Sequence, residues 1–170
     1  MEEVVLVDKD DNVIGTSEKM AAHQSGQLHR AFSIFIFNSK GEILLQQRAM
    51  HKYHSGGLWT NACCSHPRPE EPTIDAANRR LTEELGMKTD LSFLFTFTYE
   101  AEFENGLIEH ELDHVFVGNS DIMPVLNTDE AINYKYLTVE NLIQDVKVKP
   151  ENYTFWFRKI YEKVINNYNL

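Results

Sequence analysis

The sequence predicts a fold of the α/β or α+β class. A mixed β-sheet is expected to be sandwiched by helices within one domain, residues 1–170. Three observations support this prediction. Segments with the composition of strands outnumber those with helical periodicity, short turns join most of them, and the clearest helix lies near the middle of the chain. A chain of 170 residues is also long enough to bury a core without disulfide bonds.

The amino-terminal segment predicts a hairpin followed by a short helix. Residues 4–8 (VVLVD) and 13–15 (VIG) are apolar, and the polar residues between them favour a turn. Residues 17–23 (SEKMAAH) are then expected to form a short helix capped by Ser17.

A second pair of strands is expected next. Residues 31–37 (AFSIFIF) are apolar and aromatic, the turn NSKG follows, and residues 42–48 (EILLQQR) supply the partner strand. Residues 49–57 have little periodicity and contain two adjacent glycines, so this segment is expected to be a loop.

Residues 73–85 form the clearest predicted helix. Thr73 is suited to the N-cap, alanines fill the first half, and Gly86 stands where a glycine commonly ends a helix.

The remaining elements complete the sheet and its helices. Residues 92–103 and 107–117 predict two long strands, and residues 134–137 predict a late strand. Residues 139–146 and 154–168 predict helices, the second of them amphipathic.

Composition and charge exclude several functional classes. The net charge of −10 argues against a broad nucleic-acid surface, although a few basic residues could still hold a small anionic substrate. No apolar run could span a bilayer, and the acidic start differs from a signal peptide, so no membrane association and a cytoplasmic location are expected. Cys63 and Cys64 are adjacent, too close for ordinary disulfide geometry, which suits a reducing compartment.

The helix at 73–85 carries the motif RRLTEELG. Arg79 and Glu83 share a face, as do Arg80 and Glu84, and such i,i+4 pairs usually form ion pairs on a solvated surface. With its flanks, however, the motif resembles the Nudix box, G-x5-E-x7-R-E-U-x-E-E-x-G-U, where U is aliphatic. The matching residues are Glu71, Arg79, Leu81, Glu83, Glu84, Gly86 and Met87.

Two positions depart from the Nudix box. Ser65 stands where the first glycine would be, and Arg80 replaces the first glutamate of the helix. In Nudix hydrolases the helix glutamates bind the ions that activate water, so the arginine removes a metal ligand and adds a cation suited to phosphate oxygens. The altered box therefore favours diphosphate binding without hydrolysis.

Histidines and carboxylates form a second candidate site. His23, His29 and His66 could combine with Glu109 and Glu111, whose side chains leave the same face of a predicted strand. Such a set would suit Mn, Fe, Zn or Mg, although each histidine alone is better explained by solvation or hydrogen bonding than by metal binding. The other histidines fit no ligand pattern: His51, His54, His110 and His114.

Nearly the whole chain resembles one enzyme family. The segments AAHQSGQLHRAFS, QQRAMHK, GLWTNACCSHP, RRLTEELG, IEHELDHVF and NYTFWF occur in this order from about Leu6 to the terminal helix. Together they resemble the type I isopentenyl-diphosphate Δ-isomerases, which are Nudix-fold enzymes of isoprenoid synthesis. The most specific segment is WTN-x-x-C-x-HP.

This resemblance implies a role for each matching residue. The implied catalytic residues are Cys64, Glu111 and Tyr99. The implied ligands of the His/Glu metal site are His23, His29, His66, Glu109 and Glu111, with Mn, Zn or Mg as the ion. Glu84 would bind a Mg ion that bridges to the diphosphate. Lys19, Arg48, Lys52 and Arg80 would bind the diphosphate itself, and Trp156, with Tyr99, would line the hydrocarbon end.

The implied reaction is a 1,3-allylic proton shift between isopentenyl diphosphate and dimethylallyl diphosphate through a carbocation-like species. Cys64 and Glu111 are expected on opposite sides of the substrate, and which of them donates first is open. The small diphosphate is the expected partner, and both a monomer and a homodimer fit the sequence.

One geometric requirement follows for Tyr99. A two-residue turn at Asn105-Gly106 would pair Tyr99 with Leu112, facing away from Glu111. A three- or five-residue loop, or a bulge, would place Tyr99 opposite Glu111. We therefore predict an irregular turn.

Two other functions are compatible with parts of the sequence. A metal-dependent Nudix hydrolase would explain the box and the acidic charge, but not Arg80 or Cys64. A non-catalytic, Nudix-like diphosphate-binding protein would retain the site without turnover. A structural zinc site at the cysteines and histidines fits less well, because adjacent cysteines make joint tetrahedral ligation awkward.

Overall fold

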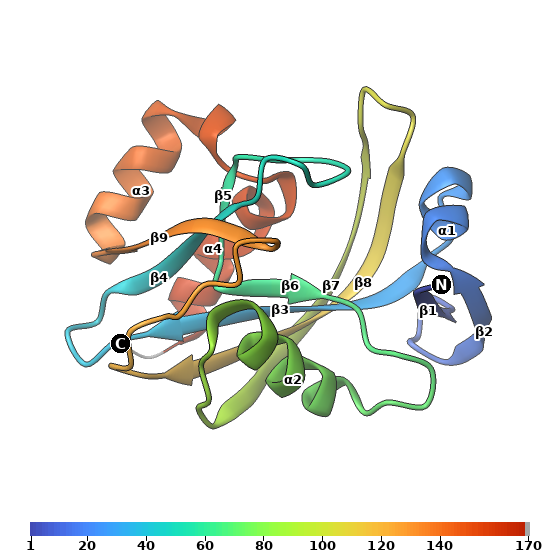
Figure 1. Cartoon of the computed structure of the whole chain (residues 1–170), viewed down its shortest axis with the longest axis horizontal. Helices are drawn as coiled ribbons and strands as arrows, with labels where there is room; N and C mark the ends of the chain where they lie inside the picture. Colours follow the sequence, from blue (N-terminus) through green and yellow to red (C-terminus); the bar gives the residue numbers. More distant parts are fainter. Residues whose placement is uncertain (169–170) are drawn as a thin grey trace.

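One mixed β-sheet of nine strands forms the centre of the structure, a computed structural model that describes residues 1–168 (Figure 1). The strands are β1 (Glu3–Val7), β2 (Val13–Glu18), β3 (His29–Phe37), β4 (Ile43–Arg48), β5 (Trp59–Thr60), β6 (Cys63–Ser65), β7 (Leu91–Glu102), β8 (Ile108–Asn119) and β9 (Ala131–Leu137). The helices are α1 (Lys19–Ser25), α2 (Thr73–Leu85), α3 (Val139–Val148), the 3₁₀ helix η1 (Pro150–Asn152) and α4 (Phe155–Asn167).

Strand β3 is the centre of the sheet. It pairs antiparallel with β1, β4 and β6, and it runs parallel to β8 with His29 opposite Glu111. The β7–β8 hairpin extends the sheet beyond β8, and β9 pairs antiparallel with β4. Because β6 and β8 both pair with β3, side chains from sequence segments far apart meet along this strand.

Helices cover both faces of the sheet, as predicted (Figure 1). Side chains alternate along β3, so Phe32, Ile34 and Ile36 pack with α2, whereas Phe35 and Phe37 pack with α4 on the other face. All five side chains are fully buried. Each contributes roughly 1.5–3 kcal/mol through removal from water, and together they hold the layers in place.

Two helix caps differ from the prediction, and one agrees with it. Helix α1 begins at Lys19 because the side chain of Glu18 accepts the N–H of Ala21 at 2.9 Å, whereas Ser17 belongs to β2. Thr73 is the first residue of α2 and not its N-cap. Gly86 ends α2 in the left-handed conformation, with φ of 61° and its N–H bonded to Thr82 O.

The turn between β7 and β8 is irregular, as predicted. Glu102 pairs with Ile108, which leaves residues 103–107 as a five-residue loop. Within the loop, Gly106 has a φ of 80° and donates its N–H to Phe103 O at 2.9 Å. This register places Tyr99 directly opposite Glu111.

The segment between β4 and β5 contains no helix or strand, in agreement with the predicted loop. The side-chain amide of Asn105 donates to Tyr53 O at 2.8 Å, which ties this loop to the tip of the β7–β8 hairpin. Among residues 1–168, no helix has both the length and the apolar character needed to cross a membrane.

Candidate active site

A cavity of about 50 Å³ collects nearly all of the predicted site residues. Its lining comes from α1, β4 to β8, the loop before β5, α2 and α4. Only His23 and His29 of the predicted set do not line the cavity itself, and both are fully buried within ligand distance of His66 and Glu111. The fold thus brings the predicted residues to one place.

Three imidazoles and one carboxylate form a tight buried group. His23 comes from α1, His29 from the start of β3, His66 from the residue after β6, and Glu111 from β8. One ligand atom from each lies within 4.8 Å of the others. His66 Nε2 is 2.8 Å from Glu111 Oε1, and His29 Nε2 is 3.5 Å from the same oxygen.

The ring orientations fit a divalent metal ion. Nδ1 of His23 donates to Lys19 O at 2.7 Å, and Nδ1 of His29 donates to Gln27 O at 2.8 Å. In both rings this leaves a buried Nε2 without a hydrogen-bond partner, and its lone pair faces the group. Metal-ligating histidines commonly have their other nitrogen fixed in this way.

Burial keeps two of these rings neutral, which is the form that binds metal. It lowers the pKa of His23, and it lowers the pKa of His66 to about 4 despite the nearby charge of Glu111.

Glu109 and Glu111 share the hydroxyl of Tyr99. The Tyr99 oxygen lies 2.7 Å from Glu111 Oε2 and 3.0 Å from Glu109 Oε2. Burial and the adjacent charge of Glu111 raise the pKa of Glu109 to about 8. Burial acts in the same direction on Glu111, but His66 and His29 outweigh it and hold the pKa of Glu111 well below its usual value.

Cys64 is held by three polar neighbours. Trp156 Nε1 donates to its Sγ at 3.1 Å, the thiol donates to Asn61 Oδ1 at 3.1 Å, and Ser33 Oγ lies 3.4 Å away. Burial raises the pKa of Cys64, so the group is a thiol at neutral pH. Cys63 faces the other side of the sheet, fully buried in the core beneath α2.

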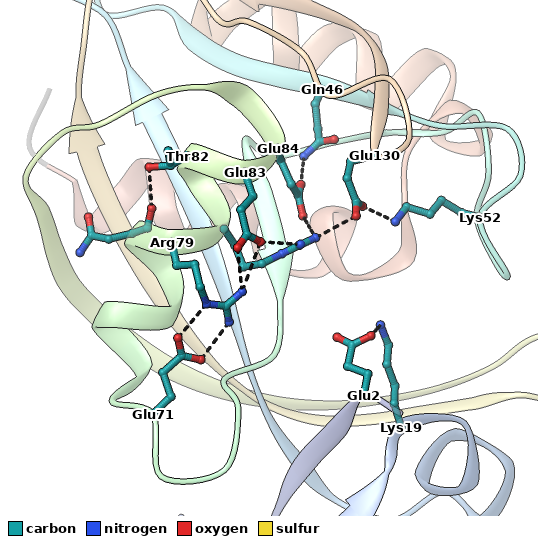
Figure 2. Close-up of polar contacts among 12 residues, drawn as sticks. Glu2, Lys19, Gln46, Lys52, Glu71, Arg79, Thr82, Glu83, Glu84 and Glu130 are labelled. Carbon is teal, nitrogen blue, oxygen red and sulfur yellow. Dashed lines mark hydrogen bonds and ion pairs between the residues drawn. The ribbon is translucent and has the colours of Figure 1, made fainter.

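The predicted diphosphate-binding cations each contact a carboxylate or a backbone oxygen. Figure 2 shows Lys19 beside Glu2 and Lys52 beside Glu130. Lys19 Nζ is 3.1 Å from Glu2 Oε2. Arg48 donates to His54 O at 3.2 Å and lies 5.2 Å from the centre of the Trp156 ring.

Arg80, on helix α2, also forms ion pairs with the charged residues around the cavity. Its guanidinium lies 2.6 Å from Glu84 and 3.1 Å from Glu130. Glu84 is buried, and its second oxygen accepts from Gln46 at 2.9 Å. The predicted pairing within α2 is confirmed for Arg80 with Glu84 and for Arg79 with Glu83 at 3.3 Å.

Sequence reasoning missed several residues in or beside the site, among them Asn61, Glu130 and His54. Asn61 bonds to Cys64, and its position within WTN was the available signal. Glu130 contacts Lys52 and Arg80 from the segment before β9, which shows no motif. His54 lies 2.8 Å from Glu109, although its loop has no periodicity from which to infer this. His110 and His114 contact Gly26 and Asp11 instead, away from the cavity.

Known proteins resemble this chain over nearly its whole length. Residues 27–163 match the NUDIX domain family. The chain is 54% identical over 165 residues to "Isopentenyl-diphosphate Delta-isomerase 2" of Aromatoleum aromaticum, covering 97% of this chain and 87% of that protein. It is 50% identical to "Isopentenyl-diphosphate Delta-isomerase" of Pectobacterium atrosepticum, covering 95% of this chain and 90% of that protein.

Solved structures agree with the fold. DR0079 from Deinococcus radiodurans superposes with a TM-score of 0.79 at 21% identity, covering 99% of this chain and 100% of that one. The MutT protein from Methanosarcina mazei gives 0.68 at 20% identity, covering 82% and 94%. With a NUDIX domain and sequence relatives of this similarity, the chain belongs to the isopentenyl-diphosphate Delta-isomerase family.

Proposed function

We propose that Cys64 and Glu111 are the two proton-transfer groups with which this isomerase interconverts isopentenyl diphosphate and dimethylallyl diphosphate. One observation supports this most strongly. Both side chains line the same small cavity, and they reach it from β6 and β8, which pair with β3 on its two sides. A proton can therefore be added at one end of the allylic unit and removed at the other.

The reaction needs an acid and a base in turn. The acid protonates the terminal alkene carbon, and the base takes a proton from the neighbouring methylene group. Because the interconversion runs both ways, each group donates in one direction and accepts in the other. The hydrogen bonds from Trp156 to Cys64 and from Tyr99 to Glu111 hold both groups in place for these transfers.

The carbocation-like species between the two proton transfers requires a pocket with little water. The cavity of about 50 Å³ is lined in part by Tyr99 and Trp156, both of them buried. The electron-rich ring of Trp156 favours positive charge nearby. We assign these two aromatic residues to the hydrocarbon end of the substrate.

The diphosphate is assigned to the basic side of the cavity. Lys19, Arg48, Lys52 and Arg80 line it, and phosphate oxygens would replace the carboxylates that now contact three of them. We assign a divalent ion, Mn, Zn or Mg, to His23, His29, His66, Glu109 and Glu111, and Mg to Glu84. When bound, these ions supply positive charge that tunes the proton affinity of Glu111 and neutralises the diphosphate.

An assay of wild type and Cys64→Ser with isopentenyl diphosphate, Mg²⁺ and Mn²⁺ tests the proposal. Wild type should give dimethylallyl diphosphate, and Cys64→Ser should lose at least about a hundredfold in kcat. Release of inorganic phosphate or a monophosphate by wild type would instead indicate a hydrolase. Substrate binding without either product would indicate a binding protein.

A further inference from the structure

His54 has the features of a metal ligand, although its sequence context gives no sign of one. It lies in the loop between β4 and β5, yet only 6% of its surface is exposed. Its Nε2 is 2.8 Å from Glu109 Oε1. Ligand atoms of His54, Glu109 and His23 all lie within 4.8 Å of one another.

The His54 ring is oriented in the same way as those of His23 and His29. Its Nδ1 faces the hydroxyl of Ser55 at 3.2 Å, and its Nε2 points into the buried site. Although close to Glu109, that Nε2 has no hydrogen-bond partner of adequate geometry in the described chain. A buried imidazole nitrogen without a hydrogen-bond partner calls for a further group such as a metal ion.

Aromatic packing fixes this orientation. The His54 ring stacks on Phe103 with centroids 4.4 Å apart and an interplanar angle of 6°. Its edge meets the ring of Trp156 at 5.8 Å. Because Asn105 also ties the loop to the hairpin tip, the ring is held where a ligand is needed, with little rotational freedom left to lose.

The two groups of donors share His23, which favours one ion over two. His23 is common to both groups, and its Nδ1 is already bonded to Lys19 O, so it has only one nitrogen to offer. Without His23, the second group would keep just His54 and Glu109, too few for a separate protein site. Taken together, the two groups offer four imidazoles and two carboxylates, and they meet at His23.

We propose that His54 binds the divalent ion through Nε2, as a fourth imidazole ligand beside Glu109. This inference rests on the metal site proposed above and adds a residue to it. It predicts that the ion is held partly by the loop before β5, which also carries Lys52 of the diphosphate site.

The test measures Mn²⁺ binding by EPR, without reference to turnover. His54→Phe keeps the ring stacking and removes the nitrogen, so its Mn²⁺ affinity should fall at least about tenfold. His51→Phe is the matched control, because His51 is exposed in the same loop and should bind Mn²⁺ as wild type does. Equal affinity of His54→Phe and wild type would overturn the inference.

A measurement on the wild type keeps the test decisive if His54→Phe folds poorly. Pulsed EPR of the Mn²⁺-loaded protein should count four coupled imidazoles, and a count of three would reject His54 as a ligand. His23→Ala distinguishes a failure of the His54 inference from a failure of the whole metal site. If His23→Ala loses Mn²⁺ while His54→Phe does not, only the His54 inference fails. If neither variant loses Mn²⁺, the proposed metal site itself fails.

Discussion

The hydroxyl of Tyr99 lies 2.7 Å from Glu111 Oε2, directly across the β7–β8 pair. This contact depends on the length of a turn at the far end of the hairpin. A two-residue turn at Asn105-Gly106 would have paired Tyr99 with Leu112, and the five-residue loop shifts the register so that Glu111 takes that place.

Tyr99→Phe should therefore lower kcat by about tenfold to a hundredfold with little change in KM, because it removes one hydrogen bond to a charged group. Stacking on the Phe97 ring, at 5.4 Å, should preserve the fold. Steady-state kinetics measure the effect. Tyr136→Phe, outside the cavity, is the control and should behave as wild type. An unchanged kcat for Tyr99→Phe would show that the Glu111 contact has no part in proton transfer.

The long β7–β8 hairpin illustrates what sequence can and cannot predict. The residues on either side of Asn105-Gly106 identified both strands, and the requirement that Tyr99 meet Glu111 predicted an irregular turn. The site residues that were predicted lie in motifs with fixed spacing, such as the WTN segment and the box helix. His54 and Glu130 lie in segments without periodicity, so only the folded chain shows that they reach the cavity.

Local capping was also harder to predict than the elements themselves. Ser17 was the better cap by residue type, but pairing with Val4 keeps it in β2, and the longer side chain of Glu18 reaches the Ala21 N–H instead. Tertiary pairing here outweighs a preference of about 1 kcal/mol.

The two cysteines should respond differently to substitution. Cys64→Ala removes a proposed proton-transfer group and should reduce kcat at least about a hundredfold. Cys63 is fully buried beneath α2, so Cys63→Ala should retain activity but lower the free energy of unfolding by about 1 kcal/mol. Kinetics and urea unfolding of both variants measure this. A large loss of kcat in a folded Cys63→Ala would mean that the catalytic thiol has been assigned to the wrong cysteine.

Glu130 competes with the diphosphate for its cations. One of its oxygens contacts Lys52 (Figure 2), and the other lies 3.1 Å from the Arg80 guanidinium. Glu130→Gln removes this negative charge, so KM for isopentenyl diphosphate should fall by about threefold or more while kcat changes little. Asp129→Asn is the control, since Asp129 is exposed and forms no ion pair within residues 1–168. A rise in KM would instead assign Glu130 to holding the cations in place for the substrate.

The Glu71–Arg79 pair predicts a pH dependence of stability separate from catalysis. Arg79 donates to both oxygens of Glu71, at 2.7 and 2.8 Å, and clamps the segment before α2 onto the helix (Figure 2). The Arg79 guanidinium lowers the pKa of Glu71 below its ordinary value of 4.5. The stabilisation is therefore complete above that value and disappears as pH falls through the lower folded pKa.

Glu71→Gln should lower the free energy of unfolding by about 1 kcal/mol near neutral pH, a value typical of partly exposed pairs. The difference from wild type should shrink as the pH falls below 4.5 and the carboxylate of wild type becomes protonated. Urea unfolding across this pH range measures both effects. Glu70→Gln, at the exposed neighbouring position, is the control and should change neither the free energy of unfolding nor its pH dependence. If the effect of Glu71→Gln did not depend on pH, hydrogen bonding without charge would account for the stabilising Glu71–Arg79 contact.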